Sequence, residues 1–249
     1  MQSSRPSVSP DFWLEPLTID NHIQDFHELC ADESAAQWST QRPTESFESS
    51  RELMKRVFIW NPQKPWIINY AFMSSKYSAP DSDGSSGNTR PKMVGIVKTT
   101  RESPWGLSIG YKVRSDCWGK GYATRAVKMF LDEYWSQPRK APREAIYGTR
   151  EKNEADIVTF HVTPALDVSD QTQNMGKPDS EEDGDGEIEI THLIAQIDPM
   201  NLGSMRVAEK CDGNFITISK KSLKVWRFDE MRDLAVFRFV KPSAVAPPG

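Results

Sequence analysis

A glycine loop between a strand pattern and a helix pattern is the part of this sequence best suited to chemistry. The loop reads Gly119-Lys120-Gly121 and leads directly into a run with helical spacing. The first N–H groups of a helix have no partner inside the helix, and the helix dipole adds positive charge at the same end. Such an end binds anions, phosphates above all. The alternative is an ordinary sharp turn that needs only the conformational freedom of glycine.

The segments on either side of this loop supply the strand and the helix. Residues 107 to 113 alternate apolar side chains with polar or small ones, which is the two-residue period of a strand with one buried face. Between residues 123 and 134 the apolar side chains recur three and four positions apart, which predicts one buried stripe on a helix. The next proline is Pro138, so a helix of roughly four turns is expected.

Two well-known phosphate-binding loops do not fit these residues. A Walker loop requires Ser or Thr after its lysine, whereas Lys120 is followed by Gly121. A dinucleotide-binding fingerprint requires a third glycine, where this chain has Thr124, and an acidic residue about 20 positions later at the end of a strand. Glu144 lies near that distance, but in a proline-rich stretch. The dinucleotide interpretation is therefore weak.

The segment Trp118-Gly-Lys-Gly-Tyr-Ala-Thr124 resembles the pyrophosphate-binding loop of the GNAT superfamily, the acyl-CoA-dependent N-acyltransferases. The family pattern is Gln/Arg-x-x-Gly-x-Gly/Ala, and Gly121 and Ala123 occupy its last two fixed positions. The tryptophan replaces the usual Gln or Arg, as in the branch that resembles ribosomal-protein N-terminal acetyltransferases. That branch also favours a Gly-Tyr pair on the preceding strand, which Gly110-Tyr111 matches.

A second segment carries the same resemblance. In the family, an apolar strand ends in Asn-x-x-Ser and the following helix closes with Glu-Lys. Here Asn201 and Ser204 follow an apolar run, and Glu209-Lys210 closes the next helical pattern. The asparagine is also placed to cap that helix, so a capping role and a ligand contact both remain open. The resemblance covers residues 93–215 directly.

The resemblance implies how acetyl-CoA is held. The pyrophosphate binds the backbone of the glycine loop, the thioester arm runs along the preceding strand, and the asparagine contacts the cofactor. The predicted acetyl-CoA contacts are Tyr111, Lys112, Val113, Trp118, Gly119, Lys120, Gly121, Tyr122, Ala123, Thr124 and Asn201. No Cys or His pair has the spacing of a zinc site, so no metal is expected.

Acyl transfer to an amine requires a neutral amine and an acid for the departing thiolate. An alkyl amine with a pKa of about 10.4 loses its proton at a cost of about 4.6 kcal/mol at pH 7, whereas an α-amine near 7.8 loses it for about 1 kcal/mol. Many family members use a tyrosine on the second helix as the acid, but this chain has Ala208 there. Ser204 is the predicted replacement, the alternative being a serine that bonds only the backbone of its own helix.

Two residues near Asn201 are candidates for the base. Glu189 and His192 lie on or beside the strand that precedes the asparagine. They are an odd number of positions apart, so they face opposite sides of a strand and only one of them can reach a common cleft.

Composition excludes several classes of protein. The chain of 249 residues can bury a large core, and no apolar run approaches the roughly 18 residues of a membrane span. The three cysteines, Cys30, Cys117 and Cys211, are far apart, which indicates a reducing compartment, the cytoplasm or the nucleus. An acidic run over residues 179–189 accounts for the net charge of −4, and the remainder is too weakly basic to predict nucleic-acid binding. The oligomeric state stays open.

The order of the patterns predicts an α/β fold, a mixed and mostly antiparallel central sheet of six or seven strands flanked by helices on both faces, as the resemblance implies. One N-acetyltransferase domain is expected over residues 11–241, between disordered tails at 1–10 and 242–249. Within it, residues 74–91 read as a polar loop and residues 137–186 as an insertion. A solvated surface loop is the expected form of the insertion, with a substrate-recruiting flap as the alternative.

These observations together predict an N-acetyltransferase that moves an acetyl group from acetyl-CoA to an amine by direct attack in a ternary complex. The acceptor is a protein N-terminus or a small-molecule amine, and no nucleic-acid or membrane partner is expected. The alternative is a catalytically inactive acyl-CoA-binding regulatory protein, favoured by the missing tyrosine and by the lack of an evident base.

Overall fold

The computed structural model describes residues 11–58, 61–77, 91–148 and 186–242. These residues contain a four-stranded sheet in the order β1-β2-β3-β4, a three-stranded sheet in the order β7-β9-β8, and a two-stranded β5-β6 ribbon. Neighbouring strands within each sheet are antiparallel. The strands are β1 (Phe12–Pro16), β2 (Asn69–Ser74), β3 (Lys92–Thr99), β4 (Ile109–Val113), β5 (Lys140–Pro142), β6 (Glu187–Glu189), β7 (His192–Ile197), β8 (Asn214–Leu223) and β9 (Arg232–Val240).

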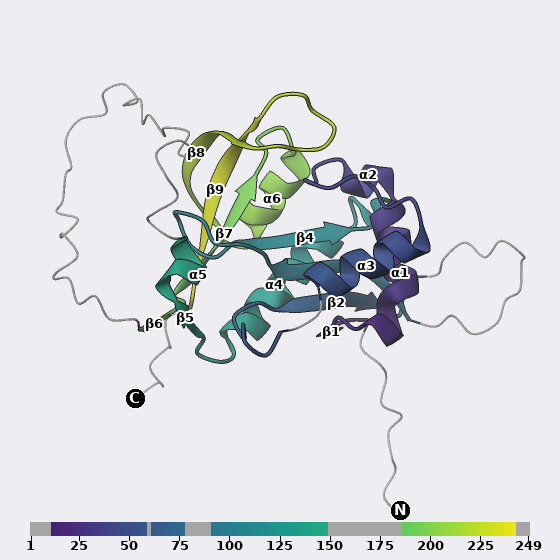
Figure 1. Cartoon of the computed structure of the whole chain (residues 1–249), viewed down its shortest axis with the longest axis horizontal. Helices are drawn as coiled ribbons and strands as arrows, with labels where there is room; N and C mark the ends of the chain where they lie inside the picture. The colour runs from purple at the N-terminus through teal and green to yellow at the C-terminus, as the bar shows by residue number, and fades with distance from the viewer. Residues whose placement is uncertain (1–10, 59–60, 78–90, 149–185, 243–249) are drawn as a thin grey trace, which may run out of the picture.

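Helices cover both faces of the four-stranded sheet, α1 and α3 on one side and α4 on the other (Figure 1). Strand side chains alternate between the two faces. Ala71 and Met73 of β2 therefore pack with α1 and α3, whereas Phe72 packs with Ala126 of α4. The helices are α1 (Ile19–Ala31), α2 (Glu33–Ala36), α3 (Phe47–Val57), α4 (Tyr122–Trp135), α5 (Arg143–Tyr147) and α6 (Leu202–Lys210), with a 3₁₀ turn at Ser115–Cys117.

The two larger sheets meet where β4 and β7 begin. Ser108 and Ile194 form a parallel bridge there, and the Ile194 N–H donates to the Leu107 carbonyl oxygen at 2.9 Å. Beyond the bridge β4 pairs with β3, and β7 pairs with β9. The facing edges of β4 and β7 therefore separate, and their far ends lead toward α4 and α6. The result is the predicted α/β fold, a mixed and mostly antiparallel sheet with helices on both faces.

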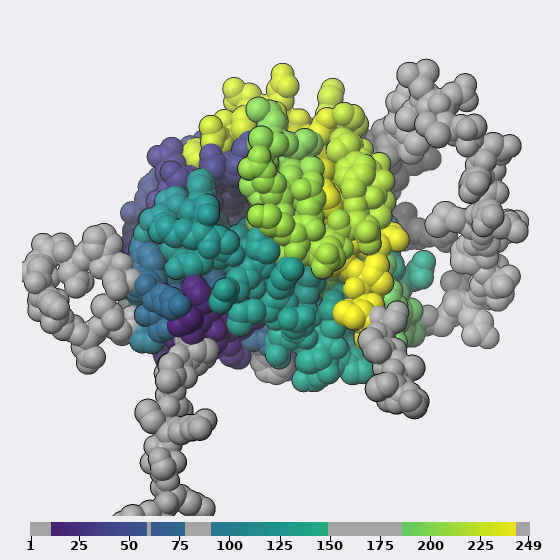
Figure 2. Space-filling view, turned by 180° about the vertical axis from the view of Figure 1, so that it is seen from behind, coloured from purple at the N-terminus to yellow at the C-terminus, as the bar shows by residue number. Residues whose placement is uncertain are grey.

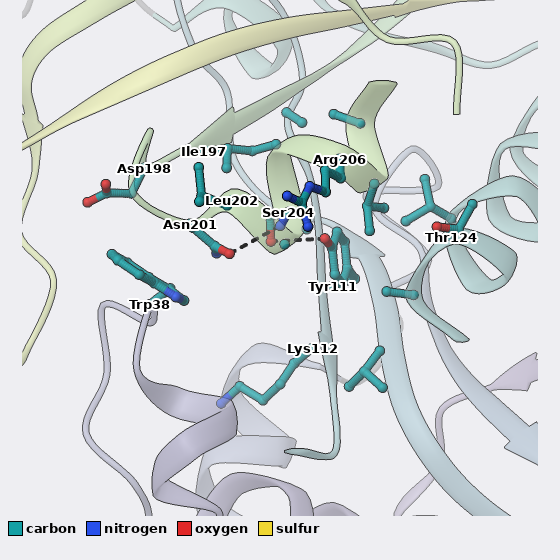
Figure 3. Close-up of a pocket in the computed structure, with 18 of the residues that line it drawn as sticks. Trp38, Tyr111, Lys112, Thr124, Ile197, Asp198, Asn201, Leu202, Ser204 and Arg206 are labelled. Carbon is teal, nitrogen blue, oxygen red and sulfur yellow. Dashed lines mark hydrogen bonds between the residues drawn. The ribbon is translucent and has the colours of Figure 1, made fainter. Parts of the chain in front are cut away.

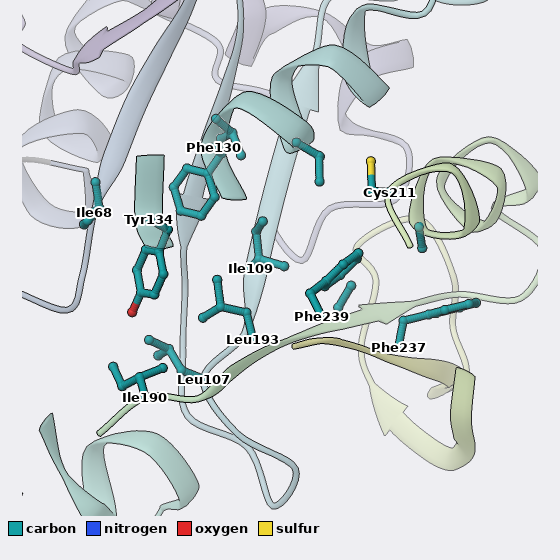
Figure 4. Close-up of a cluster of buried hydrophobic side chains, with 14 of the residues drawn as sticks. Ile68, Leu107, Ile109, Phe130, Tyr134, Ile190, Leu193, Cys211, Phe237 and Phe239 are labelled. Atoms are coloured by element: carbon teal, nitrogen blue, oxygen red, sulfur yellow. The ribbon is translucent and has the colours of Figure 1, made fainter. Parts of the chain in front are cut away.

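One hydrophobic core fastens the two sheets together (Figure 4). Leu107 and Ile109 enter it from the β4 side, Phe130 from α4, and Leu193 and Phe239 from the three-stranded sheet. Each of these side chains is buried. Because the shared core lies near the bridge, it fixes the sheets where they join while leaving the far ends of β4 and β7 apart.

The predicted insertion begins with regular structure rather than with a loop. β5 and α5 both lie inside residues 137–186, and β5 pairs with β6. Ala141 of β5 and Ile146 of α5 are buried in the common core, which explains why this part is held in place. The remainder of that segment, the predicted tails and most of the polar loop fall on 1–10, 78–90, 149–185 and 243–249, outside the described residues. Among the described residues, no helix is both long and apolar enough to cross a membrane.

Candidate active site

A cavity of about 840 Å³ lies where β4 and β7 separate. Its walls come from β4, the glycine loop, the end of β7 and α6, and from residues 35–39 after α2. Figure 2 shows the teal surface around α4 beside the green surface of α6, with the molecule hollowed between them. A cavity of this size holds a ligand of several hundred daltons.

The glycine loop opens one end of this cavity. Gly119 and Gly121 have φ angles of 73° and 78°, the left-handed region that glycine adopts without strain. Nothing lies within 4 Å of a Cβ added to Gly121, so the backbone conformation rather than crowding requires glycine. The α4 ladder starts with the Arg125 N–H donating to the Gly121 carbonyl, and the N–H groups of residues 122–124 precede it. These groups belong to residues that line the cavity.

All but one of the predicted acetyl-CoA contacts line this cavity. Lys120 does not line the cavity, and its Nζ donates to the Asp116 carbonyl at 2.8 Å. Trp118 lines the cavity with 45% of its surface exposed, and its indole N–H donates to the Val113 carbonyl at 3.0 Å. The predicted contacts that do line the cavity are Tyr111, Lys112, Val113, Trp118, Gly119, Gly121, Tyr122, Ala123, Thr124 and Asn201.

A hydrogen-bonded group crosses the cavity from β4 to α6 (Figure 3). The Tyr111 hydroxyl donates to Ser204 Oγ at 2.9 Å, and the Ser204 N–H donates to Asn201 Oδ1 at 3.1 Å. Asn201 therefore caps α6 as its residue type predicts, and it also lines the cavity. Burial raises the pKa of the Tyr111 phenol to about 12, so the phenol is protonated at neutral pH.

The structure does not bring Glu189 or His192 to the cavity. The exposed Glu189 carboxylate pairs with Lys241 Nζ at 2.6 Å, and this ammonium holds the pKa of the carboxyl below its usual value. His192 Nε2 donates to the Trp105 carbonyl at 2.8 Å, and burial lowers the pKa of the imidazole. Both residues precede Ile194, where β7 is still joined to the β4 side, whereas the cavity opens beyond that point.

The charged side chains of the cavity are mostly cations. Lys112, Arg206 and Lys210 line it, and Asp198 is the one carboxylate among the lining residues that the structure describes. Arg232 engages Asp198 through two hydrogen bonds of 2.7 and 3.3 Å, so this carboxylate is already neutralised. The sequence predicted Lys112 as an acetyl-CoA contact and placed Lys210 in the Glu-Lys ending of the second helix, whereas Asp198 and Arg206 belong to no recognisable motif.

The wall around Trp38 was also missed. It follows α2, a helix of only four residues, which is too short to show a helical period. Figure 3 places Trp38 and Asp198 at one end of the cavity and Thr124 at the other, with Tyr111 and Ser204 between them. The cavity therefore has one end at the N-terminus of α4 and an opposite end at Trp38, separated by the Tyr111–Ser204 pair.

Comparison with known proteins concerns both the family and the fold. The acetyltransferase (GNAT) domain model matches residues 11–214, whereas no curated protein sequence matches the chain. Among solved structures, a GNAT-family acetyltransferase from Bacillus anthracis is 13% identical with a TM-score of 0.55, covering 93% of this chain and 96% of that one. The spermidine N-acetyltransferase from Vibrio cholerae, in complex with CoA and spermine, is 10% identical with a TM-score of 0.54, covering 93% and 96%.

A third similar structure is the ribosomal L7/L12 alpha-N-protein acetyltransferase RimL in its apo form. It is 12% identical with a TM-score of 0.57, covering 94% of this chain and 92% of that one. Similarity at these identities establishes the fold, whereas the domain model spans most of the sequence. The chain therefore belongs to the GNAT acetyltransferase family.

Proposed function

We propose that this protein is an N-acetyltransferase that moves an acetyl group from acetyl-CoA to an amine by direct attack in a ternary complex. The observation that carries the proposal is a single cavity in which the open N-terminus of α4 and the Tyr111–Ser204 pair lie in sequence along the walls. RimL, the spermidine N-acetyltransferase and the microcin C7 self immunity acetyltransferase MccE have structures with CoA or acetyl-CoA, which supports acetyl-CoA as the donor.

The end of the cavity at the N-terminus of α4 suits the pyrophosphate of coenzyme A. The N–H groups of residues 122–124 and the α4 dipole favour an anion. Arg206 and Lys210 of α6 line the same cavity and add positive charge. The backbone of Tyr111 to Val113 lies on the edge of β4 beyond the bridge, where it is available to the amide groups of the pantetheine arm. No step of this binding requires a metal.

The Tyr111–Ser204 pair suits the departing thiolate. The Ser204 hydroxyl accepts from Tyr111, so its own hydrogen is free to point toward the sulfur. The raised pKa of the phenol disfavours a permanent loss of its proton. The proton that the thiolate finally gains is balanced by the one that the amine nitrogen loses on acylation. In this proposal the pair stabilises the thiolate by hydrogen bonding and relays that proton.

An α-amine is the acceptor that this cavity suits best. No histidine lines it among the described residues, and its one described carboxylate, Asp198, is held by Arg232. An acceptor must therefore reach the neutral state without a strong base. At pH 7 this costs about 1 kcal/mol for an α-amine but about 4.6 kcal/mol for an alkyl amine. The proposed acceptor is accordingly the α-amine of a peptide or protein N-terminus, rather than a lysine-type amine.

Two measurements test the proposal. Thermal unfolding with and without acetyl-CoA should show stabilisation of about 2.7 kcal/mol at 100 times the dissociation constant. Thiol release is then followed at pH 7 with matched peptide α-amines and alkyl amines, and faster release with the α-amines is expected. Stabilisation without turnover on any acceptor identifies an inactive acyl-CoA-binding protein instead. An unfolding temperature unchanged by coenzyme A refutes both functions.

A further inference from the structure

The acceptor half of the cavity, the end that carries Trp38, contains a cation with no counter-charge. Figure 3 shows the Lys112 side chain extending away from Tyr111, toward the N-terminal helices rather than toward Thr124. Alternation along β4 explains this direction, since neighbouring residues of a strand face opposite sides. Within the described part of the chain, Lys112 makes no hydrogen bond or ion pair that would neutralise it.

Lys98 of β3 lies on the same face of the sheet as Lys112. In the β3–β4 register Lys112 pairs with Ile96, and Lys98 pairs with Gly110, so the two lysines are diagonal neighbours. The Lys98 ammonium lies 3.8 Å from the centre of the Phe58 ring, a contact that leaves its charge without an anion. Burial, together with the nearby charge of Lys112, lowers the pKa of Lys98 to about 8. This face of the sheet is therefore short of negative charge.

A polar group on the next strand lies on the same face of the sheet, outside the lining of the cavity. Asn69 of β2 pairs with Lys98 in the β2–β3 register, so both side chains lie on the same face. Only 7% of Asn69 is exposed, and neither polar atom of its side chain has a hydrogen-bond partner among the described residues. Buried polar groups are normally satisfied, so this amide is an exception. Asn69, Lys98 and Lys112, which we term the polar row, cross three adjacent strands.

The carboxylates on neighbouring elements are already engaged. Glu28 of α1 accepts from Arg114 at 2.7 Å, and Asp32 accepts two backbone N–H groups at 2.9 and 3.0 Å. Asp198, on the other wall of the cavity, is held by Arg232. None of these groups is placed to neutralise Lys112. An anion bound beside Lys112 must therefore arrive with the ligand.

We propose that the acceptor carries a carboxylate close to its amine, and that Lys112 at the edge of the polar row binds it. This inference rests on the proposed function, because it names the acceptor class of the same cavity. The proposed class is a peptide or protein N-terminus with an acidic side chain in its first positions. A free amino acid offers the same carboxylate chemistry from another source. A polyamine is disfavoured, because its ammonium groups meet Lys112 in a cavity whose described carboxylate is already paired.

Matched acceptors test this inference. The peptides Ser-Asp-Gly-Phe-amide and Ser-Asn-Gly-Phe-amide differ by one charge at nearly constant shape, and serine with serinamide gives the corresponding pair of single amino acids. A charge-assisted hydrogen bond predicts a value of kcat/KM about 10- to 100-fold higher for the Asp peptide than for the Asn peptide. A preference confined to serine over serinamide would assign the carboxylate to a free amino acid. Spermidine is expected to be the poorest acceptor.

Variants assign the preference to Lys112. Lys112→Met should reduce the Asp-to-Asn ratio of kcat/KM to about one. Lys112→Glu should prefer a Ser-Lys-Gly-Phe-amide peptide to the Asp peptide. Lys140→Met, at an exposed lysine outside the cavity, is the matched control and should keep the wild-type ratio. A wild-type ratio of one or less in both the peptide pair and the serine pair, or a preference that survives in Lys112→Met, overturns the inference.

A binding measurement separates this inference from the proposed function. If no acceptor is acetylated, calorimetric titration of the same peptides into the protein loaded with coenzyme A still compares the Asp and Asn forms. Tighter binding of the Asp peptide that disappears in Lys112→Met supports the acceptor class even though catalysis fails. Equal affinity within both the peptide pair and the serine–serinamide pair refutes it, whatever the activity.

Discussion

Replacing Gly121 by Asn and by Asp gives a matched test of the phosphate site. At the φ of 78° observed here, a residue other than glycine costs about 1–2 kcal/mol, and Asn and Asp tolerate this region better than other residues. Nothing within 4 Å of an added Cβ makes either side chain clash. The two variants therefore carry the same strain and nearly the same shape, and they differ by one negative charge at the N-terminus of α4.

The charge sets the size of the effect. A carboxylate about 6 Å from one phosphate charge, in an environment of effective dielectric constant about 20, is repelled by about 3 kcal/mol. This repulsion corresponds to a dissociation constant for coenzyme A that is about 100-fold larger in Gly121→Asp than in Gly121→Asn. Added salt should narrow the difference, because the N-terminus of α4 is open to solvent.

Calorimetric titration with coenzyme A measures the affinities, and thermal unfolding of the unliganded variants checks that their stabilities agree. Pantetheine, which lacks the phosphates, is the control ligand, and the two variants should bind it equally. Gly121→Asp and Gly121→Asn with the same affinity for coenzyme A would refute the placement of the pyrophosphate at this loop. A difference that persists with pantetheine would show that the charge acts on another part of the ligand.

Three further predictions, tested with four variants, concern other parts of the molecule. Tyr111→Phe and Ser204→Ala should each lower kcat about 10- to 100-fold with little change in the KM for acetyl-CoA, and their effects should be non-additive in steady-state kinetics, because the two side chains share one hydrogen bond. Burial acts to raise the pKa of Glu28, but hydrogen bonds from Arg114 and a neighbouring lysine hold this pKa below 4.5. The ion pair therefore stabilises the fold above that pH, and this stabilisation is lost on acidification. Urea unfolding at about pH 6 and pH 3.5 should thus show a larger loss for the wild type than for Glu28→Gln, and equal losses would contradict the argument. Ser46→Ala removes the capping box of α3 and should cost about 1 kcal/mol in the same assay, whereas an unchanged midpoint would show that the cap contributes nothing.

Sequence reasoning succeeded where a hydrophobic period agrees with a turn-forming or helix-capping residue at its end. The alternation before the glycine loop and the helical stripe after it correspond to β4 and α4. The left-handed φ angles of Gly119 and Gly121 explain why glycine stands there. Asn201 was open to two interpretations, and the structure shows a helix cap that also lines the cavity. Such features depend on a few consecutive residues, so a linear sequence can reveal them.

The contacts that sequence reasoning missed join distant residues. Tyr111 and Ser204 lie 93 positions apart, and nothing local to either one indicates that a phenol from β4 meets the serine of α6. Glu189 and His192 were selected because they lie near the strand that leads to Asn201. Their place depends on where β7 leaves β4, and the bridge at Ile194 fixes that point through tertiary packing. A strand pattern gives the face of each side chain, but it does not give the end at which a cavity opens.

The described lining of the cavity contains no histidine and no unpaired carboxylate, and this feature and Lys112 both bear on the proposed acceptor. A cation near an ammonium group lowers the pKa of that group, by about 2 units for a separation of about 6 Å at an effective dielectric constant of about 20. A carboxylate on the acceptor would ordinarily oppose this effect by raising the pKa of the amine. When Lys112 binds that carboxylate, the two opposite charges largely offset each other at the amine. An α-amine beside an acidic side chain therefore loses its proton about as easily as one without it, so in the proposed reaction the acidic side chain adds affinity without raising the cost of a neutral amine.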